Sequence, residues 1–176
     1  GLIGNYGNNL KGLSVALKAF AVVKTSVPPF EFRILGQGNR EIWNGLISRL
    51  GLQKNVLFSP HVSGGAAVYE WLDDVDVYLQ PSFHEGLPRA LIEAMSRGCP
   101  ALASDAGGMP ELLASDNIHR RGNLRKLAKD IQKSFSAEWQ TKEAHANFKT
   151  ASAYTREILM PRRTDFWTAF KKIKTR

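Results

Sequence analysis

The stretch "VDVYLQPSFHEGLPRALIEAMSRGCPALAS", residues 75–104, contains a clear succession of strand-like and helix-like patterns. Residues 75–82 and 99–104 are short apolar runs of the kind that form buried strands. Between them, residues 88–98 carry apolar side chains at helical spacing, and Pro88 suits the first turn of a helix, where its missing N–H costs nothing. A strand, a helix and a second strand in succession predict a βαβ unit with two parallel strands.

The same alternation extends on both sides of this unit. Further strands are predicted at 30–36 and 55–60, and the chain opens on what looks like the end of a strand, as a piece of a longer protein would. Helices are predicted at 10–24, 40–51, 65–74 and, more briefly, 109–115. From about residue 122 the pattern is only helical. We therefore predict one α/β domain over 1–176, with a doubly wound, Rossmann-like parallel sheet in 1–120 and a helical tail in 121–176.

Charge is distributed unevenly over this chain of 176 residues. Residues 1–119 contain 9 Lys and Arg against 11 Asp and Glu, whereas residues 120–176 contain 15 against 5. Solvated basic helix faces explain such a tail, and an anionic membrane surface, nucleic acid or an acidic partner are the alternatives. No RNP, KH or zinc-finger pattern occurs, which disfavours a nucleic-acid-binding module.

The single Cys99 predicts a reducing, cytoplasmic environment, because it has no disulfide or metal-binding partner among cysteines. The sequence contains no run of 18 apolar residues, so no transmembrane helix is predicted. The first residues also lack the basic region of a signal peptide. The apolar residues Phe166, Trp167, Phe170 and Ile173 fall at helical spacing beside lysines. We expect this stripe to pack on the fold, with peripheral contact at the inner face of a membrane as the alternative.

Glycine-rich turns follow several predicted strands and would share one edge of the sheet. Residues 4–12, GNYGNNLKG, end in Lys11 beside a predicted helix, and backbone amides with one ammonium can hold a phosphate there. Residues 35–39 and 105–111 add two more such turns. None of the three turns matches a Walker A or GxGxxG pattern, so each alone is weak evidence for a ligand site. Three such turns at one end of the sheet are stronger evidence than any one of them.

Two acids follow the strand at 75–82. Glu85 precedes the predicted helix, and Glu93 lies within its second turn among apolar residues. A buried carboxylate needs hydrogen-bond donors, which the vicinal hydroxyls of a ligand would supply. Backbone amides, Arg89 or Arg97 would satisfy Glu93 equally well in a purely structural role.

Residues 81–113, PSFHEGLPRALIEAMSRGCPALASDAGGMPELL, resemble the C-terminal half of retaining glycosyltransferases of the GT-B fold, especially family 4. That family's signature is a pair of glutamates separated by seven residues, here Glu85 and Glu93. The likeness extends more loosely over residues 1–115. It implies that Glu85 and the amides of Gly86 and Leu87 contact a donor sugar, and that Glu93 binds the ribose of its nucleotide.

The resemblance also implies roles for the glycine-rich loops. Lys11 matches the lysine that binds the donor diphosphate, the turn at 36–38 matches part of the nucleotide pocket, and the segment at 61–62 matches the part that frames the base. Where the family often has an arginine, this chain has Asn5, so diphosphate affinity should be weaker unless another arginine compensates. The implied donor site comprises Gly4, Asn5, Lys11, Gly36, Gly38, His61, Val62, Glu85, Gly86, Leu87 and Glu93, of which Lys11 and Glu85 are the catalytic pair.

The implied reaction is transfer of a sugar from a nucleotide-diphosphate sugar to the hydroxyl of a carbohydrate or lipid-linked acceptor, with retention of anomeric configuration. The implied setting is polysaccharide or glycoconjugate biosynthesis. No cofactor and no metal site are expected, because no acidic metal-binding cluster is apparent in the sequence. The family's N-terminal acceptor domain is expected to be absent from this chain, so this part alone should bind donor but hardly turn over. The alternatives are a nucleotide-sugar epimerase and a non-catalytic nucleotide-binding domain of GT-B fold.

Overall fold

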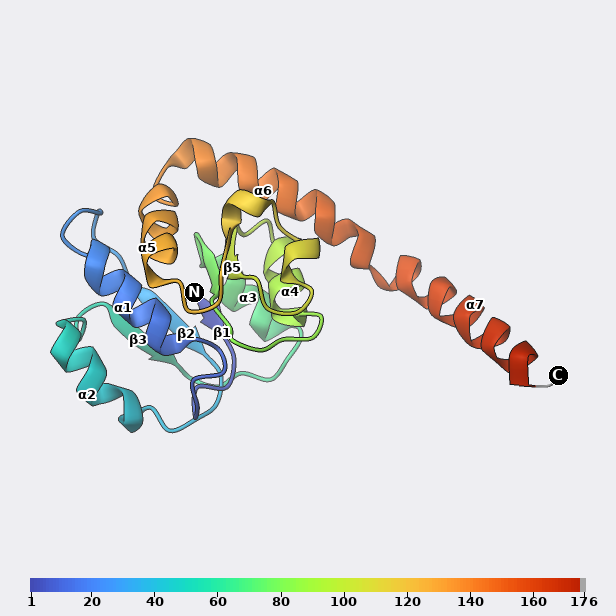
Figure 1. Ribbon diagram of the computed structural model, residues 1–176, viewed down its shortest axis with the longest axis horizontal. Coiled ribbons are helices and arrows are strands. Elements are labelled where there is room, and N and C mark those ends of the chain that lie inside the picture. The colour runs from blue at the N-terminus through green and yellow to red at the C-terminus, as the bar shows by residue number, and fades with distance from the viewer. Residues whose placement is uncertain (175–176) are drawn as a thin grey trace.

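The computed structural model describes residues 1–174 and the side chains of residues 1–171. Its centre is a set of short parallel strands in two groups (Figure 1). The first group contains β1 (Leu2–Ile3), β2 (Phe32–Leu35) and β3 (Val56–Ser59), and the second contains β4 (Tyr78–Gln80), β5 (Ala101–Ser104) and β6 (Ile118–His119). All the strand pairs within both groups are parallel, as the βαβ pattern predicts.

Backbone hydrogen bonds at Gly1 join the two groups. The Gly1 nitrogen donates to Val77 O at 2.7 Å, and the Leu79 N–H donates to Gly1 O at 2.8 Å. β1 therefore lies beside β4, and the strands follow the spatial order β3-β2-β1-β4-β5-β6. This is the order of doubly wound nucleotide-binding folds, in which the direction of winding reverses between the two central strands.

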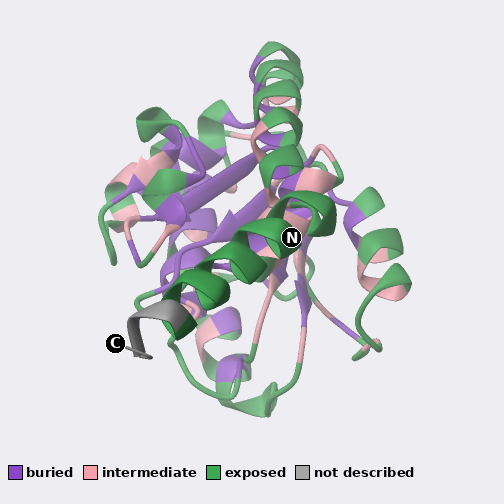
Figure 2. Ribbon diagram, turned by 90° about the vertical axis from the view of Figure 1, so that its right-hand side faces the viewer, coloured by how far each residue is buried: buried purple, intermediate pink, exposed green. Residues whose placement is uncertain are grey.

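Helices cover both faces of the sheet. The predicted segments form α1 (Leu13–Val23), α2 (Glu41–Leu50), α3 (Ala66–Asp73), α4 (Arg89–Ser96), α5 (Leu124–Lys133), α6 (Ala137–Ala151) and α7 (Arg156–Lys174), with 3₁₀ turns η1 (Met109–Glu111), η2 (Ser115–Asn117) and η3 (Ser152–Tyr154). One buried apolar cluster joins α1, α2 and α5 to the sheet, and a second joins α3, α4 and the end of α6 to it. Figure 2 shows the strands buried between these layers.

Buried hydrogen bonds hold α6 against the segments on either side of β5. The Asn147 amide donates to Cys99 O at 2.9 Å, and the Asn117 amide donates to the buried Glu143 carboxylate at 2.6 Å. Cys99 is buried, and burial raises the pKa of its thiol to about 11. Cys99 is therefore part of the apolar core beside α3 and α4.

Several boundaries differ from the predicted ones for local reasons. The first helix begins at Leu13 instead of residue 10, because the Asn8 and Asn9 side chains accept backbone N–H bonds in a turn and Gly12 has a φ of +70°. Residues 109–115 form no α-helix, because Met109–Glu111 is a 3₁₀ turn and Ser115 begins the next one, η2. β6 was not predicted, since a strand of two residues has too little alternation to be recognised.

The prediction that the apolar stripe of the tail packs on the fold is wrong for its described side chains. Phe166 is 61% exposed and Trp167 49% exposed, and these rings contact each other instead of the α/β layers. In Figure 1, α7 projects away from the rest of the chain beyond η3. The side chains of Lys172, Ile173 and Lys174 lie outside the described residues.

Candidate functional site

The loops that follow β1 and β4 meet at the point where the winding of the sheet reverses. β1 leads to α1 on one face and β4 leads to α4 on the other, so the loops diverge and leave a crevice at the carboxyl ends of the strands. Lys11 comes from the first loop and Glu85 from the second. The Lys11 Nζ lies 2.6 Å from Glu85 Oε1, which brings the two predicted catalytic residues together.

Two further side chains hold the Glu85 carboxylate. Ser82 Oγ donates to Glu85 Oε1 at 2.6 Å, and Gln80 Nε2 donates to the same oxygen at 2.8 Å. Burial alone would raise the pKa of this carboxyl, but the hydrogen bonds from Lys11, Ser82 and Gln80 outweigh burial and lower it. Glu85 is therefore held as an anion at one fixed place.

The loop that carries Glu85 rests on the glycine turn after β5. The Gly108 N–H donates to Gly86 O at 2.9 Å. Gly107 has a φ of +56°, and a Cβ on it would lie 2.3 Å from Glu85 O and 2.4 Å from Gly86 O. Only glycine allows so close an approach of the two backbones. The turn at 105–111 thus supports the second loop of the site, and both Gly86 and Leu87 remain exposed.

Glu93 differs from Glu85 in having no donor. It is half-buried on α4, and among the described residues its carboxylate accepts no hydrogen bond and forms no ion pair. Arg97, one of the possible structural partners, instead binds Asp73 with its Nε and Nη2 at 2.7 and 2.8 Å. Desolvation raises the pKa of Glu93, and the charge of Arg89 offsets this only in part. Burial raises the pKa of the Tyr78 hydroxyl, and the charges of Glu85 and Glu93 add to this rise.

A groove of about 540 Å³ lies along the carboxyl ends of β2 and β3, and Lys11, Glu85 and Glu93 are not among the residues that line it. Predicted residues Gly36, Gly38 and His61 line it, together with the unpredicted Tyr6 and Arg40. A Cβ added to Gly36 would lie 2.0 Å from Gly4 O, so the backbones of these two glycines are in close contact. Tyr6 belongs to the same loop as Lys11, so this loop borders the groove.

Asn5 and Val62 are placed less directly. The Asn5 side chain accepts the Gly7 N–H at 2.8 Å and so closes its own loop. Val62 is partly buried and is not among the residues that line the groove. The turn that Asn5 closes also presents Tyr6, whose carbonyl accepts a hydrogen bond from Trp43 Nε1 at 2.7 Å.

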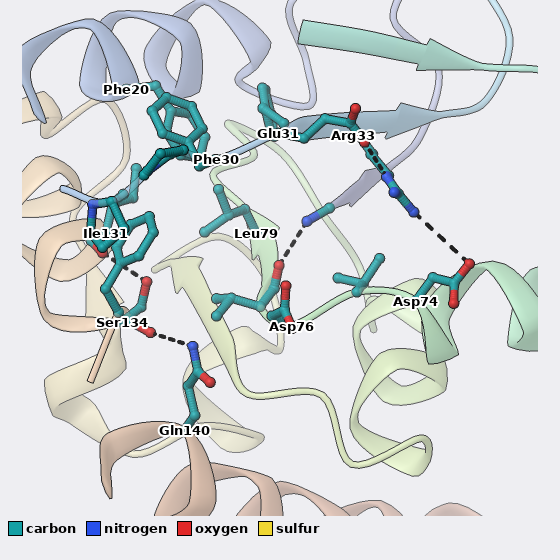
Figure 3. A pocket seen from close by; sticks show the side chains of 17 residues that line it. Phe20, Phe30, Glu31, Arg33, Asp74, Asp76, Leu79, Ile131, Ser134 and Gln140 are labelled. Atoms are coloured by element: carbon teal, nitrogen blue, oxygen red, sulfur yellow. Dashed lines mark hydrogen bonds and ion pairs between the residues drawn. The ribbon is translucent and has the colours of Figure 1, made fainter. Parts of the chain in front are cut away.

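A second hollow, of about 380 Å³, lies at the opposite ends of the strands, where β2 and β4 begin (Figure 3). Phe20, Phe30 and Leu79 give it an apolar wall, and Arg33 and Asp74 lie at its rim. None of the predicted site residues lines it. Ligands of doubly wound folds bind at the carboxyl ends of the strands. The crevice that holds Lys11 and Glu85 is therefore the candidate site.

Residues 2–153 match the protein family described as Glycosyl transferases group 1. The chain belongs to this family. It is 29% identical over 174 residues to protein CapJ of Staphylococcus aureus, covering 98% of this chain and 44% of that protein. It is 35% identical over 113 residues to the amylovoran biosynthesis glycosyltransferase AmsK of Erwinia amylovora, covering 58% of this chain and 27% of that protein.

Solved structures of glycosyl transferases share the fold. The C-terminal domain of a glycosyl transferase group 1 family protein (LpcC) from Francisella tularensis superposes with a TM-score of 0.76 at 19% identity, covering 86% of this chain and 84% of that one. Anabaena Alr3699/HepE, solved in complex with UDP, gives a TM-score of 0.77 at 21% identity, covering 97% of this chain and 48% of that one. The predicted GT-B C-terminal domain fold is thus confirmed, and the chain spans less than half the length of these curated relatives.

Two contributors to the candidate site were missed in the sequence. Gln80 is a polar residue inside an otherwise apolar strand, and Ser82 lies three residues before Glu85. A buried polar residue in a strand is itself a signal, because its amide must find partners. Among the described residues no helix is long and apolar enough to cross a membrane, and no group of three His, Cys, Asp or Glu side chains could hold a metal ion.

Proposed function

We propose that this chain is the donor-binding domain of a retaining glycosyltransferase, and that its site takes a nucleotide-diphosphate sugar. The observation that carries the proposal is the half-buried Glu93 carboxylate, which has no donor among the described residues. A carboxylate in that state gains most from the two donors of a ribose diol. The charges of Glu93 and Glu85 both act on Tyr78, which suits one extended ligand that reaches both acids.

The proposed ligand lies across the crevice in a set order. Its base occupies the groove at Gly36, Gly38 and His61, and its ribose binds Glu93. Its diphosphate lies against Lys11 and the amides of residues 86–87, and its sugar reaches Glu85. As the bond between the sugar and the diphosphate breaks, negative charge grows on the leaving diphosphate. The Lys11 ammonium and the backbone amides would stabilise that charge.

UDP is the first nucleotide to test, since a structural neighbour was solved with it. Isothermal titration calorimetry of the chain with UDP, GDP and ADP should show binding of one of them. Glu93→Gln should weaken that binding by about tenfold or more, the effect of losing hydrogen bonds to a charged group. Glu138→Gln, at an exposed site on α6, is the matched control and should leave the affinity unchanged. Equal affinity of the Glu93→Gln variant and the unchanged chain would refute the ribose role.

We expect the same titration to be unchanged by EDTA, because the site offers a lysine and amide donors for the diphosphate. Transfer itself would need the acceptor-binding part of a longer protein, in keeping with the chain's share of its relatives' length. A carbohydrate or lipid-linked acceptor in polysaccharide biosynthesis fits the name of the relative AmsK. For a cytoplasmic enzyme with such an acceptor, the cationic and aromatic α7 would suit peripheral contact with the inner membrane face.

A further inference from the structure

Glu85 receives more hydrogen bonds on one oxygen than that oxygen can fully use. Lys11, Ser82 and Gln80 all donate to Oε1, at 2.6, 2.6 and 2.8 Å. A carboxylate oxygen offers about two lone-pair sites, so three donors compete for them. The other oxygen, Oε2, accepts no hydrogen bond from any described residue. The site therefore holds Glu85 by one oxygen and leaves the second oxygen open.

Gln80 is held in place by its own partner. It is 1% exposed, and its Oε1 accepts a hydrogen bond from Tyr78 Oη at 3.1 Å. Tyr78 is fully buried and belongs to the apolar cluster that joins α3 and α4 to the sheet. An ionised carboxylate can only accept, so Gln80 must turn its NH₂ group toward Glu85 and its oxygen toward Tyr78. The Glu85 carboxylate therefore fixes which end of the amide faces it, and the Tyr78 hydroxyl, by donating to the amide oxygen, holds Gln80 in that orientation.

The three donors differ in their freedom to move. The Lys11 side chain is 28% exposed and ends in an ammonium on a flexible stem, whereas Gln80 and Ser82 are buried at 1% and 0%. Two buried donors are enough to fill the lone pairs of Oε1. Lys11 can thus leave Glu85 for an anionic ligand without leaving the carboxylate unsupported.

We propose that Gln80, oriented by Tyr78, is a positioning residue of this site: with Ser82 it retains Glu85 Oε1, keeps Oε2 open to the ligand and frees Lys11 to bind the diphosphate. This inference rests on the proposed donor-binding function. Gln80 and Tyr78 act only through Glu85, and neither touches the ligand.

The first test needs no ligand. Gln80→Met replaces the amide with an apolar side chain of similar length, and the Glu85 carboxyl is titrated by ¹³C NMR. The pKa of Glu85 should move upward when the Gln80 hydrogen bond is lost, while that of Glu93 should stay in place. An unchanged Glu85 titration in a folded variant would overturn the proposal.

The second test is a double-mutant cycle on binding of UDP and UDP-glucose. Gln80→Met should weaken binding about tenfold in the otherwise unchanged chain, but less than twofold in a Glu85→Ala background. Equal losses in both backgrounds would show a general structural effect and overturn the positioning role.

Two further outcomes are separable. If Gln80→Met fails to fold, Tyr78→Phe removes only the orienting hydroxyl; it should raise the Glu85 pKa and weaken binding about threefold, again only when Glu85 is present. Tyr78→Phe with neither effect would overturn the proposal.

If the unchanged chain binds no nucleotide, the proposed donor-binding function fails. The NMR titration of Glu85, which needs no ligand, still decides the role of Gln80.

Discussion

Glu85 and Glu93 belong to the same segment, yet the fold treats their carboxylates in opposite ways. Glu85 has three donors, and its pKa is lowered despite the burial that opposes this. Glu93 has none among the described residues, and desolvation raises its pKa. The protein therefore stabilises one anion, whereas the other has no hydrogen-bond donor in the described part of the chain. Both acids could be predicted from the sequence, but this difference depends on Gln80 and Ser82, whose roles became evident only in the structure.

Glu85→Gln should destabilise the chain at pH 7. A lowered pKa means that ionised Glu85 stabilises the fold above the ordinary glutamate pKa of 4.5, and that this contribution is lost as pH falls through the lower folded value. Loss of one charge-assisted hydrogen bond, about 2 kcal/mol, should lower Tm by about 5 °C. The difference should shrink at pH 3 to 4 in scanning fluorimetry. A deficit that is constant with pH would contradict an electrostatic origin.

Glu93→Gln should have the opposite sign. A raised pKa means that the folded state binds the Glu93 proton more tightly, so the chain loses stability as pH rises from 4.5 through the folded value. The neutral amide avoids this cost, and since Glu93 is only half-buried the gain in Tm at pH 7 should be about 1–2 °C. The gain should vanish below pH 4. A lower Tm at pH 7 would mean that the fold needs the Glu93 charge.

At the scale of elements, the loop carrying Glu85 depends on one glycine of the turn beneath it. Gly107→Ala adds a Cβ 2.3 Å from Glu85 O and requires an unfavourable φ of +56°. We expect a loss of about 2 kcal/mol in stability and at least tenfold weaker UDP binding, because the Glu85 loop must shift. Gly45→Ala, inside α2 with open space around it, is the control and should stabilise by about 0.5–1 kcal/mol. Unfolding in urea and calorimetry measure the two effects, and a Gly107→Ala chain that binds UDP normally would contradict the supporting role.

The elements predicted best were those with long repeating patterns. The βαβ segment 75–104 contains a run long enough to fix both the helix and the parallel strands around it. The start of α1 and the two-residue β6 escaped prediction, because turn chemistry at Asn8 and Asn9 and pairing with β5 decide them. Such local hydrogen bonds leave no periodic trace in the sequence.

For the whole molecule, strand order decides where the site lies. Lys11 and Glu85 are 74 residues apart and meet because β1 lies beside β4. The parallel pattern predicted that all the glycine-rich loops would share an edge, since parallel strands end on the same side. It did not predict which loops would be neighbours, because that depends on how Gly1 pairs with residues 77–79.

Removal of residues 156–176 should leave the Lys11–Glu85 site intact. The described side chains of α7 are exposed, whereas Ala151 and Tyr154 before it pack against the apolar cluster of α3 and α4. Truncation after Thr155 therefore keeps that packing and removes only a projecting helix, so Tm should change by less than about 2 °C. UDP affinity should also stay the same, and solubility should rise because the exposed rings of Phe166 and Trp167 are gone. A fall in Tm of several degrees in scanning fluorimetry would mean that α7 packs back on the α/β layers in solution, as the apolar stripe in the sequence had predicted.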